Sequence, residues 1–250
     1  WWGMLVDHCV THGDGICSVE PASILPTTLQ FAVIENARKD DCCARDWFAG
    51  GALNFTGRDA QDNQLRILNT IFRNDYAIDG NGGLHLMLGN ALVFGCLFEG
   101  CVSGSTGSAF GFEHGGGRVL NSTVVGGNGL GAIDSFDMGT EMNNLLTGNT
   151  DAIRGWGNVH VRWDMSFDIE DPSSYTQRPL AATDLSGIDA HFIDAASGDY
   201  RLAAGSPAID AAGDAAALLL PGETLPDLDL AGQPRRCGEA LDVGAFEYCP

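Results

Sequence analysis

Five short apolar segments in the middle of the chain each carry a non-apolar or glycine residue at their centre. These central residues are Asn54, His85, Gly111, Asp134 and Arg154. If the segments stack in register, their central side chains form one outward column, with Glu113 on the same face and His114 beside it. An imidazole, carboxyl groups and a guanidinium over a bare glycine could hold a sugar and transfer protons to or from it. The candidate catalytic residues are therefore His85, Glu113, Asp134 and Arg154.

Three residues near this column could contact a glycan without catalysis. Trp156 ends the last of the five segments and could stack on a sugar ring. Asn54 and His114 supply hydrogen-bonding groups on the same face. The alternative is that the column is an ordinary solvated surface and that the tryptophan packs in the core or in a turn. A register error of one residue would turn the whole column into the core.

A repeat must position these residues. Six-residue stretches with a polar or glycine start, an apolar centre and a polar or glycine end recur along the chain. They begin at Asn69, Gly95, Asn121 and Asn143, and a weaker copy begins at Asp164, so that the steps are 26, 26, 22 and 21 residues. A near-constant step in this range indicates a solenoid, because no single unit can bury its apolar face alone.

The apolar runs predict strands rather than helices. They are four to six residues long, rich in Val, Ile, Leu and Phe, and bounded by Gly, Asn and Asp. Two strands per step with tight turns predict an all-β fold, a parallel β-helix in which coils lie about 4.8 Å apart. At that spacing Asn69, Asn121 and Asn143 could hydrogen-bond to one another in a ladder.

The charge of the chain restricts its partners. There are 33 acidic residues against 13 basic ones, a net charge of -20 at pH 7. Nucleic acids and anionic membrane surfaces would be repelled by this charge, and so would a polyanionic polysaccharide without bridging cations. No apolar run is long enough to span a bilayer. The expected partner is a polysaccharide or a surface protein.

The cysteines favour an oxidising compartment. Their number is eight, which is even, in a chain rich in loops and glycine. The expected pairs are Cys9–Cys17, Cys96–Cys101 and Cys237–Cys249. The chain starts at Trp1 and shows no signal peptide, so we expect a processed or truncated product that is secreted or held at the cell surface.

The organisation changes towards the end of the chain. We expect coils over residues 1–168 with an insertion loop at about 37–50, a linker over 169–188, and a C-terminal cap over 189–250. The last part contains Gly198-Asp199-Tyr200-Arg201-Leu202, Gly205-Ser206-Pro207-Ala208-Ile209-Asp210 and Asp242-Val243-Gly244-Ala245-Phe246-Glu247-Tyr248. This ordered set resembles the C-terminal end of bacterial right-handed parallel β-helix repeat proteins of the secreted, "choice-of-anchor" type. The resemblance implies secretion and a right-handed β-helix, but no particular reaction.

Three enzyme families can be compared with these residues. Alginate-type lyases use a set of His, Arg, Lys and Asp on β-helix faces, which His85, Asp134 and Arg154 resemble loosely. Asn149-Thr150-Asp151 resembles the start of the polygalacturonase motif, but the Gly-His-Gly and Arg-x-Lys parts of that motif are missing. A pectate-lyase site resembles a calcium-bound carboxylate cluster with a basic residue, and only Asp134 and Arg154 are aligned for it. Ca²⁺ therefore stays open as a cofactor, and no metal site is assigned.

These observations leave three hypotheses. The first is a structural or adhesive module that contacts a glycan or a protein and is not an enzyme. The second is a polysaccharide lyase or glycosidase that acts on the outward face of the coils. The third is a subunit of an extracellular filament or homo-oligomer, joined end to end through an open N-terminal coil.

Overall fold

The computed structural model describes residues 5–6, 18–19, 27–39, 50–56, 64–87, 90–115, 117–137, 140–149, 153–157, 160–162, 165–166, 183 and 185–250. Within these ranges the chain is all-β, and its helical elements are the short 3-10 helices η1 (Ala195–Ser197) and η2 (Ala215–Leu218). All strand pairs in the described ranges are parallel except β24–β25. The predicted fold class is thus confirmed at the level of stacked parallel sheets.

Three large sheets and a small one hold the parallel strands. The eight-stranded sheet contains, in order, β1 (Leu5–Val6), β4 (Val33–Glu35), β8 (Ile71–Arg73), β12 (Leu97–Glu99), β16 (Thr123–Val125), β19 (Leu145–Thr147), β22 (Met165–Ser166) and β23 (Leu185–Ser186). The β10 sheet contains β2 (Ser18–Val19), β6 (Leu53–Thr56), β10 (Leu84–Met87), β14 (Gly107–Gly115), β17 (Gly131–Asp137) and β20 (Ile153–Gly157). The β11 sheet contains β3 (Thr27–Gln30), β7 (Gln64–Leu68), β11 (Asn90–Phe94), β15 (Arg118–Leu120), β18 (Thr140–Met142) and β21 (His160–Arg162). The small sheet contains β5 (Arg38–Lys39), β9 (Tyr76–Ala77) and β13 (Val102–Ser103).

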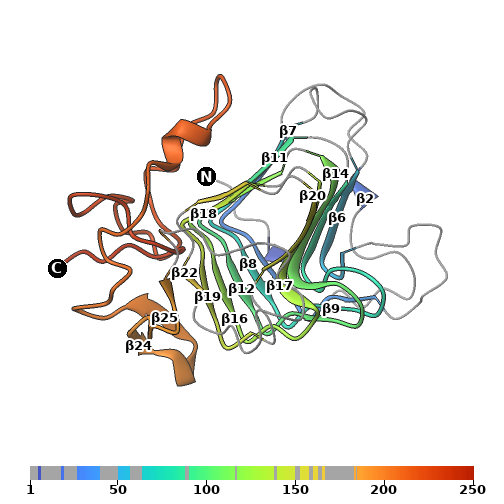
Figure 1. The fold of residues 1–250 in the computed structure, drawn as a ribbon, viewed down its shortest axis with the longest axis horizontal. Coiled ribbons are helices and arrows are strands. Elements are labelled where there is room, and N and C mark those ends of the chain that lie inside the picture. Colours follow the sequence, from blue (N-terminus) through green and yellow to red (C-terminus); the bar gives the residue numbers. More distant parts are fainter. Residues whose placement is uncertain are drawn as a thin grey trace.

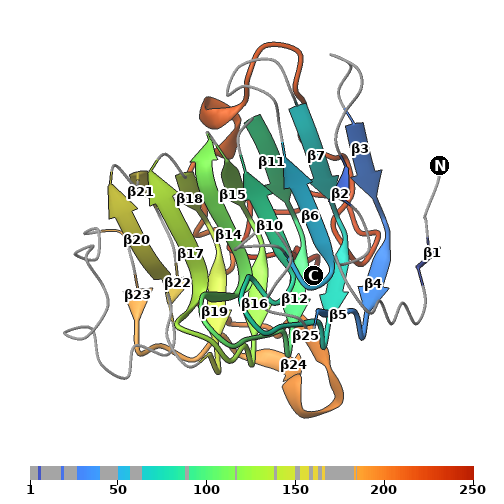
Figure 2. The same cartoon turned by 90° about the vertical axis from the view of Figure 1, so that its right-hand side faces the viewer.

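The chain visits these sheets in a fixed order, and we call one such passage a winding. It runs through β6, β7, β8 and β9, and then through β10, β11, β12 and β13. Each strand pairs with its counterparts in the neighbouring windings, as when Ile71 pairs with Leu97 and Leu84 with Phe110. Figure 1 looks along the stack and shows the large sheets around a common interior, and Figure 2 shows the strands side by side. The repeated six-residue stretches therefore include the strands of the eight-stranded sheet.

Two tight corners flank each of the strands β4, β8, β12, β16 and β19 of the eight-stranded sheet. The residue that makes each turn has a positive φ, for example 47° at Asn69 before β8 and 54° at Asn74 after it. Asparagine and glycine tolerate this left-handed conformation best, which explains their recurrence at these places. At the first corner, Asn143 donates from Nδ2 to Oδ1 of Asn121 at 3.2 Å. The predicted asparagine ladder is therefore confirmed for this pair.

Strand alternation separates two apolar surfaces. In β11, Ala91 and Val93 point into the core between the sheets, whereas Leu92 and Phe94 pack in a second cluster outside it. The inner core is rich in phenylalanine, and the rings of Phe72 and Phe98 stack with centroids 4.7 Å apart. β11 is apolar on both faces because a second layer of chain covers its outer face.

That layer is the C-terminal segment, residues 189–250, which includes β24 (Phe192–Asp194), β25 (Asp199–Leu202) and the two 3-10 helices. It is drawn in orange and red beside the stack in Figure 1. First-corner asparagines bind its backbone: Asn69 donates to the carbonyl of Leu228 at 2.9 Å, and Asn121 to that of Asp242 at 2.8 Å. The described contacts thus run along the flank of several windings. The expected boundaries at 168 and 188 and the capping role stay predictions.

Candidate functional site

The predicted column exists in the backbone register. Strands β6, β10, β14, β17 and β20 pair so that the five central residues follow one another across the sheet. The pairs are Asn54 with His85, His85 with Gly111, Gly111 with Asp134, and Asp134 with Arg154. The sequence alignment of these segments is therefore confirmed.

The column is covered rather than open to solvent. Its neighbours Leu84 and Phe110 lie in the core, so the column faces the other way. Even so, Asn54 is 7% exposed, His85 3% and Asp134 1%. The expectation of an open outward face is wrong for these three residues, and over His85 it is the polar side chain of Asn81 that lies within hydrogen-bonding distance.

Asn81 is the main covering group. Its Nδ2 lies 2.8 Å from Nδ1 of His85, and its Oδ1 accepts a hydrogen bond from the Thr106 hydroxyl at 3.2 Å. A Cβ atom on Gly111 would come within 2.4 Å of the Asn81 side chain. Gly111 is therefore needed for close approach, and the expected open floor is filled by Asn81.

His85 is poised to stay neutral. Burial, and then the positive charge of Lys39, lower its pKa to about 3. Its Nε2 lies 3.6 Å from Oε2 of Glu113, which is half-buried. Lys39 is itself buried and forms an ion pair with Asp79 at 3.3 Å. The arrangement can hold hydrogen bonds in place, but it does not offer an imidazolium to a polymer outside.

The sequence alone did not identify Lys39, Asp79, Asn81 or Thr106 as members of this cluster. We expected residues 37–39 in an insertion loop, yet Arg38 and Lys39 form β5, which pairs with β9. The sequence did contain a signal for Lys39. It is the one lysine in the sequence, and a neighbouring winding carries acidic residues that could pair with it. Residues 40–49 lie outside the described part of the structure.

Three of the predicted site side chains are not described. For Arg154 and Trp156 only the backbone of β20 is placed, and for His114 only that of β14. Their proposed roles in catalysis or glycan contact stay predictions. Among the described residues, no group of three or more His, Cys, Asp or Glu side chains could hold a metal ion. Bound Ca²⁺ also stays an untested expectation.

The three predicted cysteine pairs have three different outcomes. Cys237 and Cys249 form a disulfide, as expected. Cys96 and Cys101 are free and buried, so the predicted pair is wrong. Each lies in a different corner at opposite ends of β12, and an extended strand keeps them too far apart for a bond. Cys9 and Cys17 lie outside the described residues.

A pocket of about 760 Å³ opens in the C-terminal segment. Exposed Asp214, Asp227 and Arg236 supply charged groups to its wall, and the half-buried Leu225 and Leu241 supply apolar ones. Arg235 also lines it, although its guanidinium donates to the carbonyls of Gly244 and Ala245. Polar groups around an apolar floor are typical of small-ligand sites. This pocket was not predicted, because its lining comes from residues that are spread over positions 212–241 and share no repeat.

Comparisons with known proteins give no identification. No protein-family model matches the chain. No curated protein and no solved structure matches it either. Within the described residues there is also no helix with the length and apolar character to cross a membrane.

Proposed function

We propose that the chain is a right-handed parallel β-helix module, secreted or displayed at the cell surface, with a structural or adhesive role. It contacts a glycan or a protein and does not act as an enzyme. The parallel sheets and the repeated register support the solenoid part of this proposal. The Cys237–Cys249 disulfide supports an extracellular location, because such bonds persist in oxidising compartments. The resemblance of the C-terminal motifs to secreted repeat proteins agrees with both.

One observation favours the binding role over catalysis. The described column residues Asn54, His85 and Asp134 are each less than a tenth exposed. A general acid or base must come within hydrogen-bonding distance of the atom to which it transfers a proton. A polysaccharide cannot reach these buried side chains without displacing the groups that cover them, which at His85 include Asn81 and its partner Thr106.

The pocket of the C-terminal segment is the contact site that we propose. Its carboxylates and the exposed guanidinium of Arg236 can bind hydroxyl or amide groups, and its leucines can pack against the apolar face of a sugar or side chain. The net charge of -20 favours a neutral glycan over a polyanion. A peptide segment is the other occupant that the test distinguishes.

A panel of neutral and acidic polysaccharides tests this proposal. We expect saturable binding without new reducing ends or unsaturated products, with or without calcium. Arg236→Ala should weaken binding at least tenfold, while Arg201→Ala, an exposed arginine paired with Asp199 outside the pocket, should not. Equal binding by the Arg236 variant would contradict the assignment of the pocket.

The enzyme hypothesis gives the opposite result. Cleavage that is abolished by Asp134→Asn or Arg154→Ala would refute the non-catalytic role and place chemistry on the column. If no polysaccharide binds, capture of peptides in the same pocket would instead favour the protein-contacting form of the module.

End-to-end assembly is a second candidate function. β23 is the last strand of the eight-stranded sheet, and it has exposed apolar side chains at and near it. These are Leu185 and Ile188. Exposed apolar groups at a sheet edge favour association. A concentration series by light scattering tests this, since a strict monomer at high concentration would count against it.

A further inference from the structure

The second corner follows the strands β4, β8, β12, β16 and β19, and it uses one residue pattern in these windings. It consists of a residue with positive φ and then a residue that is buried. The corners described are Asn36-Ala37, Asn74-Asp75, Gly100-Cys101, Gly126-Gly127 and Gly148-Asn149. These residues occupy equivalent places because the strands before them pair in register.

Asn149 shows the complete hydrogen-bonding pattern. Its Oδ1 accepts from the backbone N–H of Gly127, the same corner one winding earlier, at 2.8 Å. Its Nδ2 donates to the carbonyl of Val124, the central residue of β16, at 3.0 Å. The side chain therefore both accepts and donates across one step of the stack.

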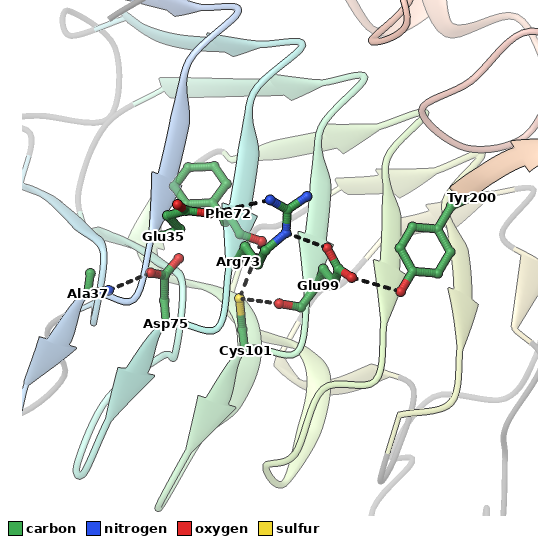
Figure 3. Close-up of polar contacts among 8 residues, drawn as sticks. All are labelled: Glu35, Ala37, Phe72, Arg73, Asp75, Glu99, Cys101 and Tyr200. Carbon is green, nitrogen blue, oxygen red and sulfur yellow. Dashed lines mark hydrogen bonds and ion pairs between the residues drawn. The ribbon is translucent and has the colours of Figure 1, made fainter. Parts of the chain in front are cut away.

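Cys101 reproduces the hydrogen bond in which Asn149 is the donor. Its Sγ lies 3.8 Å from the carbonyl oxygen of Phe72, the central residue of β8 (Figure 3). Burial, together with the neighbouring carboxylates of Asp75 and Glu99, raises the pKa of the thiol well above its usual value. The sulfur thus keeps the proton that the corner needs.

Asp75 reproduces the hydrogen bond in which Asn149 is the acceptor. Its Oδ1 accepts from the N–H of Ala37 at 2.9 Å (Figure 3), as the amide oxygen of Asn149 accepts from the N–H of Gly127 three windings further along. Its Oδ2 is buried and has no hydrogen-bond partner among the described residues. By the register, the carbonyl that corresponds to Val124 is that of Ile34 in β4. If Oδ2 takes the place of the Asn149 amide nitrogen, its ionised form meets this carbonyl as a second acceptor, whereas its protonated form can donate to it.

We propose that Asp75 is carried in the folded protein as a neutral carboxylic acid whose Oδ2–H replaces the amide N–H of Asn149 as the donor of its corner. Loss of this proton would loosen the N-terminal windings at alkaline pH. The corner is thereby a pH-sensitive element built into the stack.

The charged groups around Asp75 agree with this assignment. Glu35 on β4 and Glu99 on β12 are negative, and Arg73 on β8 is bound to both of them, at 3.3 and 2.6 Å. Figure 3 shows this guanidinium between the two glutamates and not on Asp75. Burial raises the pKa of Asp75 to about 8, the N–H groups of Ala37 and Arg73 lower it, and Glu35 raises it.

The direction of the pH effect follows from proton linkage. In the unfolded chain Asp75 ionises near its ordinary pKa of 3.8, whereas in the folded protein it keeps its proton up to about pH 8. Between these values the folded state binds more protons than the unfolded state, so stability falls as pH rises and levels off above about pH 8.

The primary test compares thermal unfolding from pH 5 to pH 9 in the whole chain. Asp75→Asn should supply the missing donor permanently, so its melting temperature should exceed that of the wild type by several degrees at pH 9 and by less at pH 5. Asp189→Asn, at an exposed aspartate, is the matched control and should leave the pH profile unchanged. Parallel profiles for wild type and Asp75→Asn, or failure of that variant to fold, would overturn the proposal.

Two further measurements remove ambiguity. Asn149→Asp should introduce the same alkaline sensitivity at a second corner, and equal destabilisation at pH 5 and pH 9 would contradict this. The infrared difference spectrum of wild type minus Asp75→Asn at pH 6 should contain the carbonyl stretch of a protonated carboxylic acid. Its absence would refute the neutral form directly.

Discussion

The windings and the C-terminal segment reach burial in opposite ways. A winding repeats the contacts of its neighbour, for example after 22 residues in the pair Thr123 with Leu145 and after 26 residues in the pair Ile71 with Leu97. The contacts of the C-terminal segment do not repeat. Each is made by a side chain that binds one backbone group or one oppositely charged side chain. Arg118 and Glu223 form such a contact, with nitrogen–oxygen distances of 2.5 and 3.0 Å.

This difference indicates where each region is vulnerable. In the windings, one lost side chain leaves the neighbouring backbone pairs in place, because stability is shared among adjacent repeats. In the segment, one lost partner leaves a buried charge or donor without compensation. The following predictions test this contrast, from the largest expected effect to the smallest.

Phe98→Ala should give the largest loss of stability. Phe98 is fully buried and stacks on Phe72, so removing its ring leaves a cavity between windings. The expected cost is about 4 kcal/mol. Phe192→Ala, at a half-buried ring of the C-terminal segment, is the matched control and should cost much less. Denaturant unfolding measures both, and equal costs would contradict the expected effect of the deeper burial of Phe98.

Arg118→Met should release the C-terminal segment while the windings persist. The substitution leaves the Glu223 carboxylate, whose side chain is 1% exposed, without its guanidinium. The expected cost is about 3 kcal/mol. Hydrogen exchange by mass spectrometry should show faster exchange around residues 215–225 and little change in β8 and β12. Arg201→Met, at an exposed ion pair, serves as the control.

The same ion pair gives the segment an acid sensitivity, opposite in sign to that proposed for Asp75. Burial raises the pKa of Glu223, but the hydrogen bonds from Arg118 and the Leu220 N–H lower it more, so that the net shift is downward. Such a group adds stability above its unfolded pKa, and this stability is lost as pH falls through the folded value. Exchange in the segment should therefore accelerate in acid in the wild type, with a weaker dependence in Arg118→Met.

Loss of the Cys237–Cys249 disulfide should have a smaller effect. The bond closes a loop with a sequence separation of 12 residues, for which the chain-entropy estimate is about 2–3 kcal/mol. Cys249→Ser should lower the melting temperature and make the protein insensitive to reductant in this region. A wild type unaffected by reductant under conditions that reduce the bond would contradict this expectation.

Tyr200→Phe should have the smallest effect. The Tyr200 hydroxyl donates to Oε1 of Glu99 at 3.0 Å on the partly exposed outer face of β12 (Figure 3). We expect a loss below about 1 kcal/mol, because solvent can replace the bond. Burial and the Glu99 contact raise the pKa of the phenol to about 12, so the small difference between the variants should persist up to about pH 10. A calorimetric comparison measures it.

The repeat was predictable from the sequence because its physical cause is local. Positive-φ corners favour Asn or Gly, and interior positions favour apolar side chains. The same residue pattern therefore recurs in the sequence of successive windings. This pattern was sufficient to align Asn54, His85 and Asp134, whose register the structure confirms. The Cys237–Cys249 pair was also predictable, since its two cysteines are close in the chain.

The candidate site was less predictable, because exposure depends on what covers a face. Alternation predicts that His85 points away from the core, but not that Asn81 and Thr106 lie over it. The free thiols of Cys96 and Cys101 are similar, since they are near in sequence yet separated by a strand that keeps them in different corners.

The sequence by itself determined the strand spacing, the corner residues and the vertical alignment of windings, because these follow from backbone geometry and local side-chain preference. The tertiary structure decided which aligned residues are exposed to solvent and where the C-terminal segment lies. It also decided the protonation states of the buried groups. Burial and electrostatics depend on every neighbour in space, and for Asp75 those neighbours include Glu35, which lies 40 positions earlier in the chain.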